Sequence, residues 1–297
     1  MTEPRLLWIS VVATGVFAAM GITWGIASGS GMIVFDGLYS LVSLGLSMMS
    51  LLALKEIAKG ESERFPFGKS QFEPMLVAFK SVTIIGMCLY AAADSVMALF
   101  DGGRDVALGS ALVYAMITTG GSLAVALLLM RHGRRLGSAL IDAEKNQWLG
   151  DTLLSLCVLI AFGVAFAVLP WSYPAAIPYV DPAMVVIASC LFLALPARSL
   201  LSAFRELLFM RADDAIADRL EAEALAAADH LSAKQHKVHV IAIGRQLEVE
   251  VNFLLDDDRG FAVTEMDAQR QRFIEVAKSF KQRAWVNMNI TRDASQL

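Results

Sequence analysis

The fold of this 297-residue chain is constrained most by a series of apolar stretches long enough to cross a lipid bilayer. A helix needs about 20 mainly apolar residues to span about 30 Å of hydrocarbon. The backbone polar groups of such a segment must be satisfied within the membrane, so these stretches predict helices. Six qualify: roughly Leu6–Ala27, Met32–Leu54, Pro74–Phe100, Val106–Met130, Asn146–Leu169 and Tyr179–Leu201. The composition, 56% apolar and only 18% charged, agrees with an integral membrane protein.

The basic residues orient the spans, because cytoplasmic loops of membrane proteins carry an excess of Lys and Arg. One set of connections contains Lys55, Lys59, Arg64 and Lys69, then Arg131, Arg134, Arg135 and Lys145, and finally Arg198, Arg205 and Arg211. The opposite set contains only Arg104. We therefore expect both termini in the cytoplasm and a multi-pass protein of the plasma (inner) membrane.

The chain divides by composition into a six-span domain, residues 1–209, and a more highly charged cytoplasmic domain, residues 210–297. The second domain alternates helical and strand periodicity in the order α-β-β-α-β. The expected elements are Asp213–Leu231, Lys237–Ile243, Gln246–Leu255, Thr264–Phe280 and Ala284–Ile290, with Gly244 in the tight connection between the first two strands and Thr264 capping the second helix. This order predicts a small two-layer α+β domain.

Several classes of protein are disfavoured by the same residues. A net charge of −4 gives no electrostatic basis for binding nucleic acid. Cys88, Cys157 and Cys190 stand singly in apolar stretches, so we expect small buried side chains rather than disulfides or metal ligands. The spans contain no histidine to act as a base and no serine with a plausible activating partner, so we do not expect an enzyme.

Polar side chains recur at one spacing in the second and fifth spans. Offsets of three, four and seven residues place each set on one face of a helix. If the two faces meet, they form an oxygen-lined pocket suited to a cation. Polar residues in spans also serve as interhelical hydrogen-bonding groups, and this alternative applies to Tyr39, Ser43 and Gln147 taken singly. The two sets are Asp36, Tyr39 and Ser43, and Glu144, Gln147 and Asp151.

At this point the chain resembles the cation diffusion facilitator family of metal transporters. The segments that carry the resemblance are Ser30-Gly31-Met32-Ile33 followed by Asp36-Gly37-Leu38-Tyr39-Ser40-Leu41, the loop from Phe65 to Pro74, and the start of the fifth span from Ala143 to Asp151. The order of spans and the α+β tail are similar to those of the family. The resemblance implies six transmembrane helices followed by a cytoplasmic ferredoxin-like domain. It also implies a homodimer, joined through that domain, that exports a divalent metal cation in exchange for protons.

The family's transport site takes two residues four apart in each of the second and fifth spans, mostly Asp or His. These positions correspond here to Tyr39, Ser43, Gln147 and Asp151, and only Asp151 keeps a usual ligand type. We expect Asp151 to be the essential carboxylate, with Asp36 adding a second charge on the access route. The transported cation is the only metal expected, with no resident cofactor.

Two alternatives remain at this level. The loss of three usual ligands favours a transport-inactive relative that acts as a regulatory or scaffold subunit. A transporter adapted to a non-metal cation is also compatible with the sequence.

Overall fold

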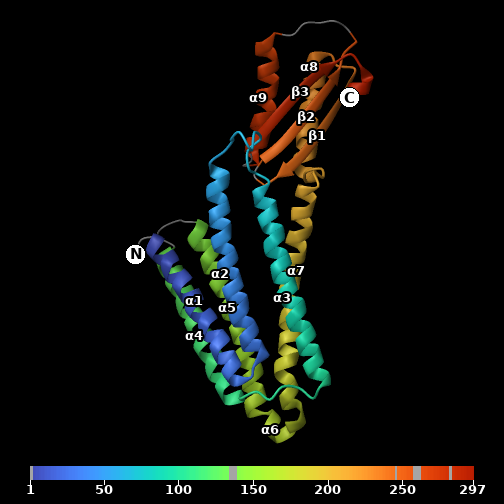
Figure 1. Ribbon diagram of the computed structural model, residues 1–297. Coiled ribbons are helices and arrows are strands. Elements are labelled where there is room, and N and C mark those ends of the chain that lie inside the picture. The colour runs from blue at the N-terminus through green and yellow to red at the C-terminus, as the bar shows by residue number, and fades with distance from the viewer. Residues whose placement is uncertain (1–2, 134–138, 245, 257–261, 281–282) are drawn as a thin grey trace. The chain divides into compact units, whose positions relative to one another are not determined.

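A computed structural model of the chain describes residues 3–133, 139–244, 246–256, 262–280 and 283–297, so Arg134 and Arg135 lie outside the described residues. Six helices of the described part are long and apolar enough to cross a membrane. The expected spans correspond to α1 (Glu3–Ser28), α2 (Gly31–Ala58), α3 (Phe72–Phe100), α4 (Leu108–Gly133), α5 (Ala139–Ala167) and α7 (Ile177–Leu207), with the short helix α6 (Leu169–Ser172) before α7 (Figure 1). The six predicted spans are thereby confirmed.

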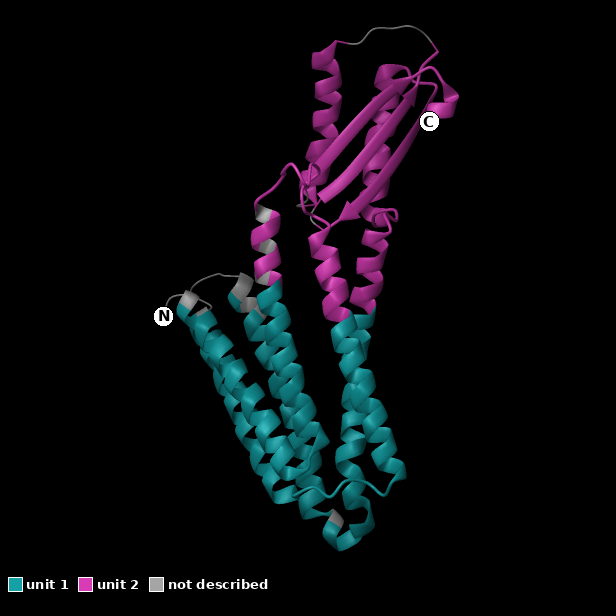
Figure 2. Ribbon diagram, in the orientation of Figure 1, with its two compact units in different colours: residues 1–49, 82–197 teal, residues 50–81, 198–297 magenta. Residues whose placement is uncertain are grey.

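The chain groups into two compact units, coloured separately in Figure 2. Unit 1 contains residues 1–49 and 82–197, and unit 2 contains residues 50–81 and 198–297. Helices α2, α3 and α7 each contribute residues to both units. The sequence boundary at residue 209 is a different division of the chain and stays a prediction.

Within unit 1, small residues let α1 and α2 approach closely. A Cβ atom added to Gly21 would lie 2.7 Å from the Cα of Gly37, and one added to Gly25 would lie 2.6 Å from the backbone nitrogen of Val34. Small residues at a spacing of four are typical of helix contacts in membranes, where close backbone approach replaces hydrophobic driving force. Helix α4 packs against both α1 and α5, and Leu6, Leu129 and Trp148 of these three helices belong to one buried cluster.

Within unit 2, the predicted tail elements are present as α8 (Asp214–Leu231), β1 (Gln235–Ile243), β2 (Gln246–Leu254), α9 (Val263–Ser279) and β3 (Arg283–Thr291). Strand β2 is central, antiparallel to β1 and parallel to β3. The core joins one face of this sheet to both helices, through residues such as Val249, Leu220 and Phe273. The fold class is confirmed: six spans followed by a small two-layer α+β domain.

The turn between β1 and β2 is hydrogen-bonded to α7 and to the turn that precedes α3, within the same unit. The backbone nitrogen of Gly244 donates to Oε2 of Glu206 at 2.8 Å, and the Ser70 hydroxyl donates to Oε1 of Gln246 at 3.0 Å. Gly244 has a φ of +57°, and a Cβ there would lie 2.9 Å from a carboxylate oxygen of Glu73. The turn therefore needs glycine for both its conformation and its close contacts.

Two sequence expectations were wrong. The N-cap residue of α9 is Ala262, no side chain caps it, and Thr264 lies inside the helix. Cys88 is buried as expected, but Cys157 and Cys190 are exposed. The outer surface of a membrane protein is apolar because lipid covers it, so an apolar neighbourhood in the sequence did not imply burial.

Candidate functional site

On helix α2, the predicted site residues face two different groups of neighbours in unit 1. Asp36 accepts a hydrogen bond from the hydroxyl of Tyr114 on α4, at 2.9 Å. The ring of Tyr39 lies against that of Phe192 on α7, with centroids 4.5 Å apart. Ser43 follows one turn later and is half-buried. Asp36 is therefore already hydrogen-bonded within the bundle, whereas Tyr39 is held by aromatic contacts.

On helix α5, Asp151 lies close enough to both Asp36 and Glu144 for their charges to interact, and it also interacts electrostatically with Tyr39. Asp151 is half-buried. The structure thus brings the carboxylate of α5 into the neighbourhood of the polar face of α2. Gln147 is exposed, whereas the other three expected positions are half-buried, so this orientation separates Gln147 from them.

The carboxylate of Glu144 is directed toward helix α1. It accepts a hydrogen bond from the hydroxyl of Ser10, and the same hydroxyl accepts one from Nε1 of Trp148 at 2.7 Å. Ser10 and Trp148 are both almost completely buried, and the Trp148 ring meets that of Phe17 edge to face. Glu144 therefore fixes α5 against α1, and it also interacts electrostatically with Asp151.

The groups that interact with Asp151 carry oxygen: the carboxylates of Asp36 and Glu144 and the phenol of Tyr39. Among the described residues, no group of three or more His, Cys, Asp or Glu side chains is close enough together to hold a metal ion. Any cation here would need neutral oxygens or water to complete its coordination, as hard cations such as Mg²⁺ and Mn²⁺ accept. The arrangement offers a cation few charged oxygen ligands and is not a closed metal centre within the described residues.

Sequence reasoning missed a buried carboxylate near the start of α7, next to the start of α2. Asp181 of α7 is only 1% exposed. It accepts hydrogen bonds from the Ser30 hydroxyl at 2.5 Å and from the backbone nitrogens of Gly31 and Met32 at 2.9 and 3.1 Å. It therefore caps the first turn of α2, where unpaired N–H groups favour a negative charge.

The same carboxylate is part of an ion network. Nη1 of Arg104 lies 3.2 Å from Asp181, and Nη2 of Arg104 pairs with Asp94 of α3. An ionisable residue in the first turn of the sixth apolar stretch was the available signal. The capping role was invisible in the sequence because Asp181 and Ser30 are about 150 residues apart.

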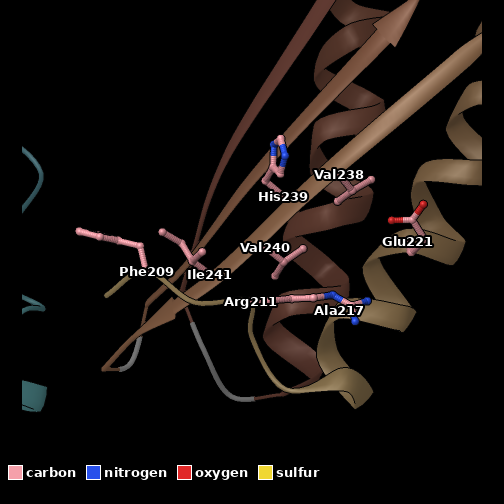
Figure 3. Close-up of a pocket in the computed structure, with 8 residues that line it drawn as sticks. All are labelled: Phe209, Arg211, Ala217, Glu221, Val238, His239, Val240 and Ile241. Atoms are coloured by element: carbon pink, nitrogen blue, oxygen red, sulfur yellow. The ribbon is translucent and has the colours of Figure 1, made fainter. Parts of the chain in front are cut away.

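The tail offers a small pocket of about 180 Å³, and Figure 3 shows the eight residues that line it. Arg211 points there toward helix α8, where its guanidinium donates to Asp214 and Asp218. His239 lines this pocket, whereas His236 pairs with Glu221 at 3.2 Å. Residue exposure alternates along β1 from Gln235 to Val240, so the two histidines occupy opposite faces of the sheet.

Six membrane-length helices with ionisable side chains between them define a multi-pass integral membrane protein. Residues 7–208 match the cation efflux transmembrane domain, so the chain belongs to the cation efflux family, also called the cation diffusion facilitator family, which is a family of transporters.

The proteins to which the chain is similar have modest identity to it. It is 25% identical over 253 residues to probable cation efflux system proteins from two strains of Mycobacterium tuberculosis, a match that covers 85% of this chain and 73% of each relative. It is also 29% identical over 154 residues to an uncharacterized transporter of Synechocystis, a match that covers 50% of this chain and 49% of that protein.

Proposed function

We propose that the chain exports a divalent metal cation from the cytoplasm in exchange for protons, through a site between α2 and α5. In this proposal Asp151 is the essential ligand, Tyr39 and Ser43 contribute neutral oxygens, and Asp36 supplies a second charge nearby. Gln147 joins the site only when α5 turns from its present orientation. Both termini lie in the cytoplasm, and two copies of the chain assemble as a homodimer through the tail domain.

The observation that carries this proposal is the position of Asp151. It is an ionisable side chain in an apolar helix, and ionisable groups within membrane segments generally mark a transport pathway. Asp151 interacts electrostatically with both Tyr39 and Asp36. Side chains of α2 and α5 therefore interact at one carboxylate. Membrane transporters commonly bind their substrate at such an interface near the middle of the bilayer.

The donor types also bear on the substrate. Carboxylate, phenol and hydroxyl oxygens favour harder divalent ions such as Mn²⁺ over ions that prefer nitrogen and sulfur, such as Zn²⁺. The proton would be carried by Asp151, which cannot bind a metal ion and a proton at the same time. Cation and proton would then compete for one group, which is the simplest basis for exchange.

The test is flux into liposomes that contain the purified full-length chain, with Mn²⁺, Co²⁺, Zn²⁺ and Cd²⁺ supplied separately. We expect Mn²⁺ flux that depends on a pH gradient and falls at least about tenfold in Asp151→Asn, as for loss of an interaction worth about 1.4 kcal/mol or more. Asp101→Asn makes the same change of charge at an exposed loop position and should retain wild-type flux. Undiminished flux in Asp151→Asn would refute the proposed site.

One observation favours the alternative of a regulatory or scaffold subunit without transport. Within the described ranges no set of three strong metal ligands converges, although metal transport sites usually gather several. Calorimetry separates the two functions: a transporter should release or absorb heat on binding at least one of the four cations. A chain that folds, binds none of them and moves none of them would be the scaffold.

A further inference from the structure

A pocket of about 350 Å³ opens on the surface of unit 1, beside the connection between α1 and α2. Its walls are mainly apolar and include Ile26, Leu38, Met87 and Ala91. Its polar end is formed by Asp94 and Arg104. The sequence motifs and the proposed cation site leave this cavity without a role.

Phe35 also lines the pocket. Phe35 is 4% exposed, and its ring centroid lies 6.4 Å from that of Tyr39 and 6.1 Å from that of Phe192. These three rings form a layer, here called the aromatic layer, with the cavity at one end. Tyr39, which interacts with Asp151, belongs to the same layer. The aromatic layer therefore connects the pocket, at Phe35, to Tyr39 of the proposed cation site.

The two carboxylates that pair with Arg104 are not equivalent. The Asp181 side chain is 2% exposed and has three further hydrogen-bond donors on Ser30, Gly31 and Met32. The Asp94 side chain is 52% exposed and faces the cavity. Arg104 also donates to Ser95 at 3.3 Å, so it keeps two partners if it leaves Asp94. The three charges sum to −1, which favours the arrival of a cation.

We propose that this cavity is the exit chamber of the transport path, and that Asp94 receives the departing divalent cation in exchange for Arg104. The inference rests on the proposed function for the origin of the cation. The ion enters the chamber when the aromatic layer parts, and it retains part of its hydration because the chamber is large enough for water. The guanidinium of Arg104 then stays with Asp181 and Ser95, and the Asp94 carboxylate is free to bind the ion.

The chamber is tested first without any transport. In a chain carrying Cys157→Ser and Cys190→Ser, Ala91→Cys places a thiol on the cavity wall, and Leu89→Cys places one on the exposed outer surface of the same helix. A positively charged methanethiosulfonate reagent should modify Ala91→Cys at least tenfold faster than Leu89→Cys in liposomes. Equal, slow modification of both by this reagent, with fast modification by a lipid-soluble maleimide, would show a lipid-filled groove and overturn the proposal.

The role of Asp94 is tested by inhibition from the exit side. In liposomes that transport Mn²⁺, added Mn²⁺ on that side should inhibit the wild type by occupying Asp94. Asp94→Asn should raise the inhibitory concentration at least tenfold. Asp101→Asn, an exposed position just beyond the end of α3, should match the wild type.

The two proposals fail in different ways. A wild type that moves none of the cations refutes the proposed function, while the thiol measurements still decide whether a hydrated chamber exists. A wild type that transports Mn²⁺, with the same exit-side inhibition in Asp94→Asn, refutes the role of Asp94 alone.

Discussion

Replacement of Asp181 by alanine should be among the most destabilising single changes in the described part of the molecule. The carboxylate is almost fully buried and accepts four hydrogen bonds, from Ser30, Gly31, Met32 and Arg104. Asp181→Ala leaves the first turn of α2 without its acceptor. It also leaves Arg104 with only its exposed partner and a serine.

The magnitude follows from the kind of interaction that is broken. Removal of one partner from a buried ion pair costs about 3–5 kcal/mol, because the remaining charge and donors lose their compensation. For a unit of this size, that loss lowers the melting temperature by on the order of 10 °C. Asp181→Asn keeps the shape and one carbonyl acceptor, so its loss should be smaller, at about 1–3 kcal/mol.

The assay uses the buried thiol of Cys88 as a reporter. With Cys157→Ser and Cys190→Ser in place, a thiol-reactive dye gains fluorescence only as Cys88 becomes exposed on heating. Asp101→Ala, at an exposed loop position, should change stability by no more than about 0.5 kcal/mol. If Asp181→Ala melted together with Asp101→Ala, the buried network would not be holding α2 and α7 together.

Three further outcomes are expected. Gly21→Val should destabilise the protein by about 1–3 kcal/mol through a clash with the α2 backbone. Gly45→Ala, at a position with open space around it, should not destabilise the protein, and thermal unfolding compares the two variants. Trp148→Phe should cost about 0.5–1.5 kcal/mol by removing the hydrogen bond to Ser10, as measured by the same melt. Phe273→Ala should cost about 3–5 kcal/mol in the tail core, detected as faster proteolysis of the tail with the spans still intact.

The spans and the tail strands could be predicted because each depends on local periodicity or length. Twenty apolar residues in a row must form a helix in a bilayer, whatever surrounds them. Alternation along Gln246–Leu254 likewise marked a half-buried strand before its partners were known. Helical offsets also placed Asp36 and Asp151 on the polar faces of their two spans, and in the structure their charges interact.

Features that depend on a distant part of the chain could not be predicted in this way. Periodicity puts Gln147 on the same face as Asp151, but the rotation of α5 leaves it exposed because Trp148 and Glu144 turn toward α1. The N-cap of α9 depends on the backbone conformation at Ala262 and overrides the side-chain preference of Thr264. Helix rotation and helix capping are both decided by packing, about which spacing in a single sequence says little.

The turn at Gly244 has a mechanical consequence for the tail. Its hydrogen bond to Glu206 and that of Gln246 to Ser70 join the tip of the β1–β2 hairpin to the last turn of α7 and to the segment just before α3. Because both connections are direct hydrogen bonds, a displacement of that hairpin must displace the end of α7 and the start of α3 together. Movement of the hairpin is therefore transmitted directly to these two helices.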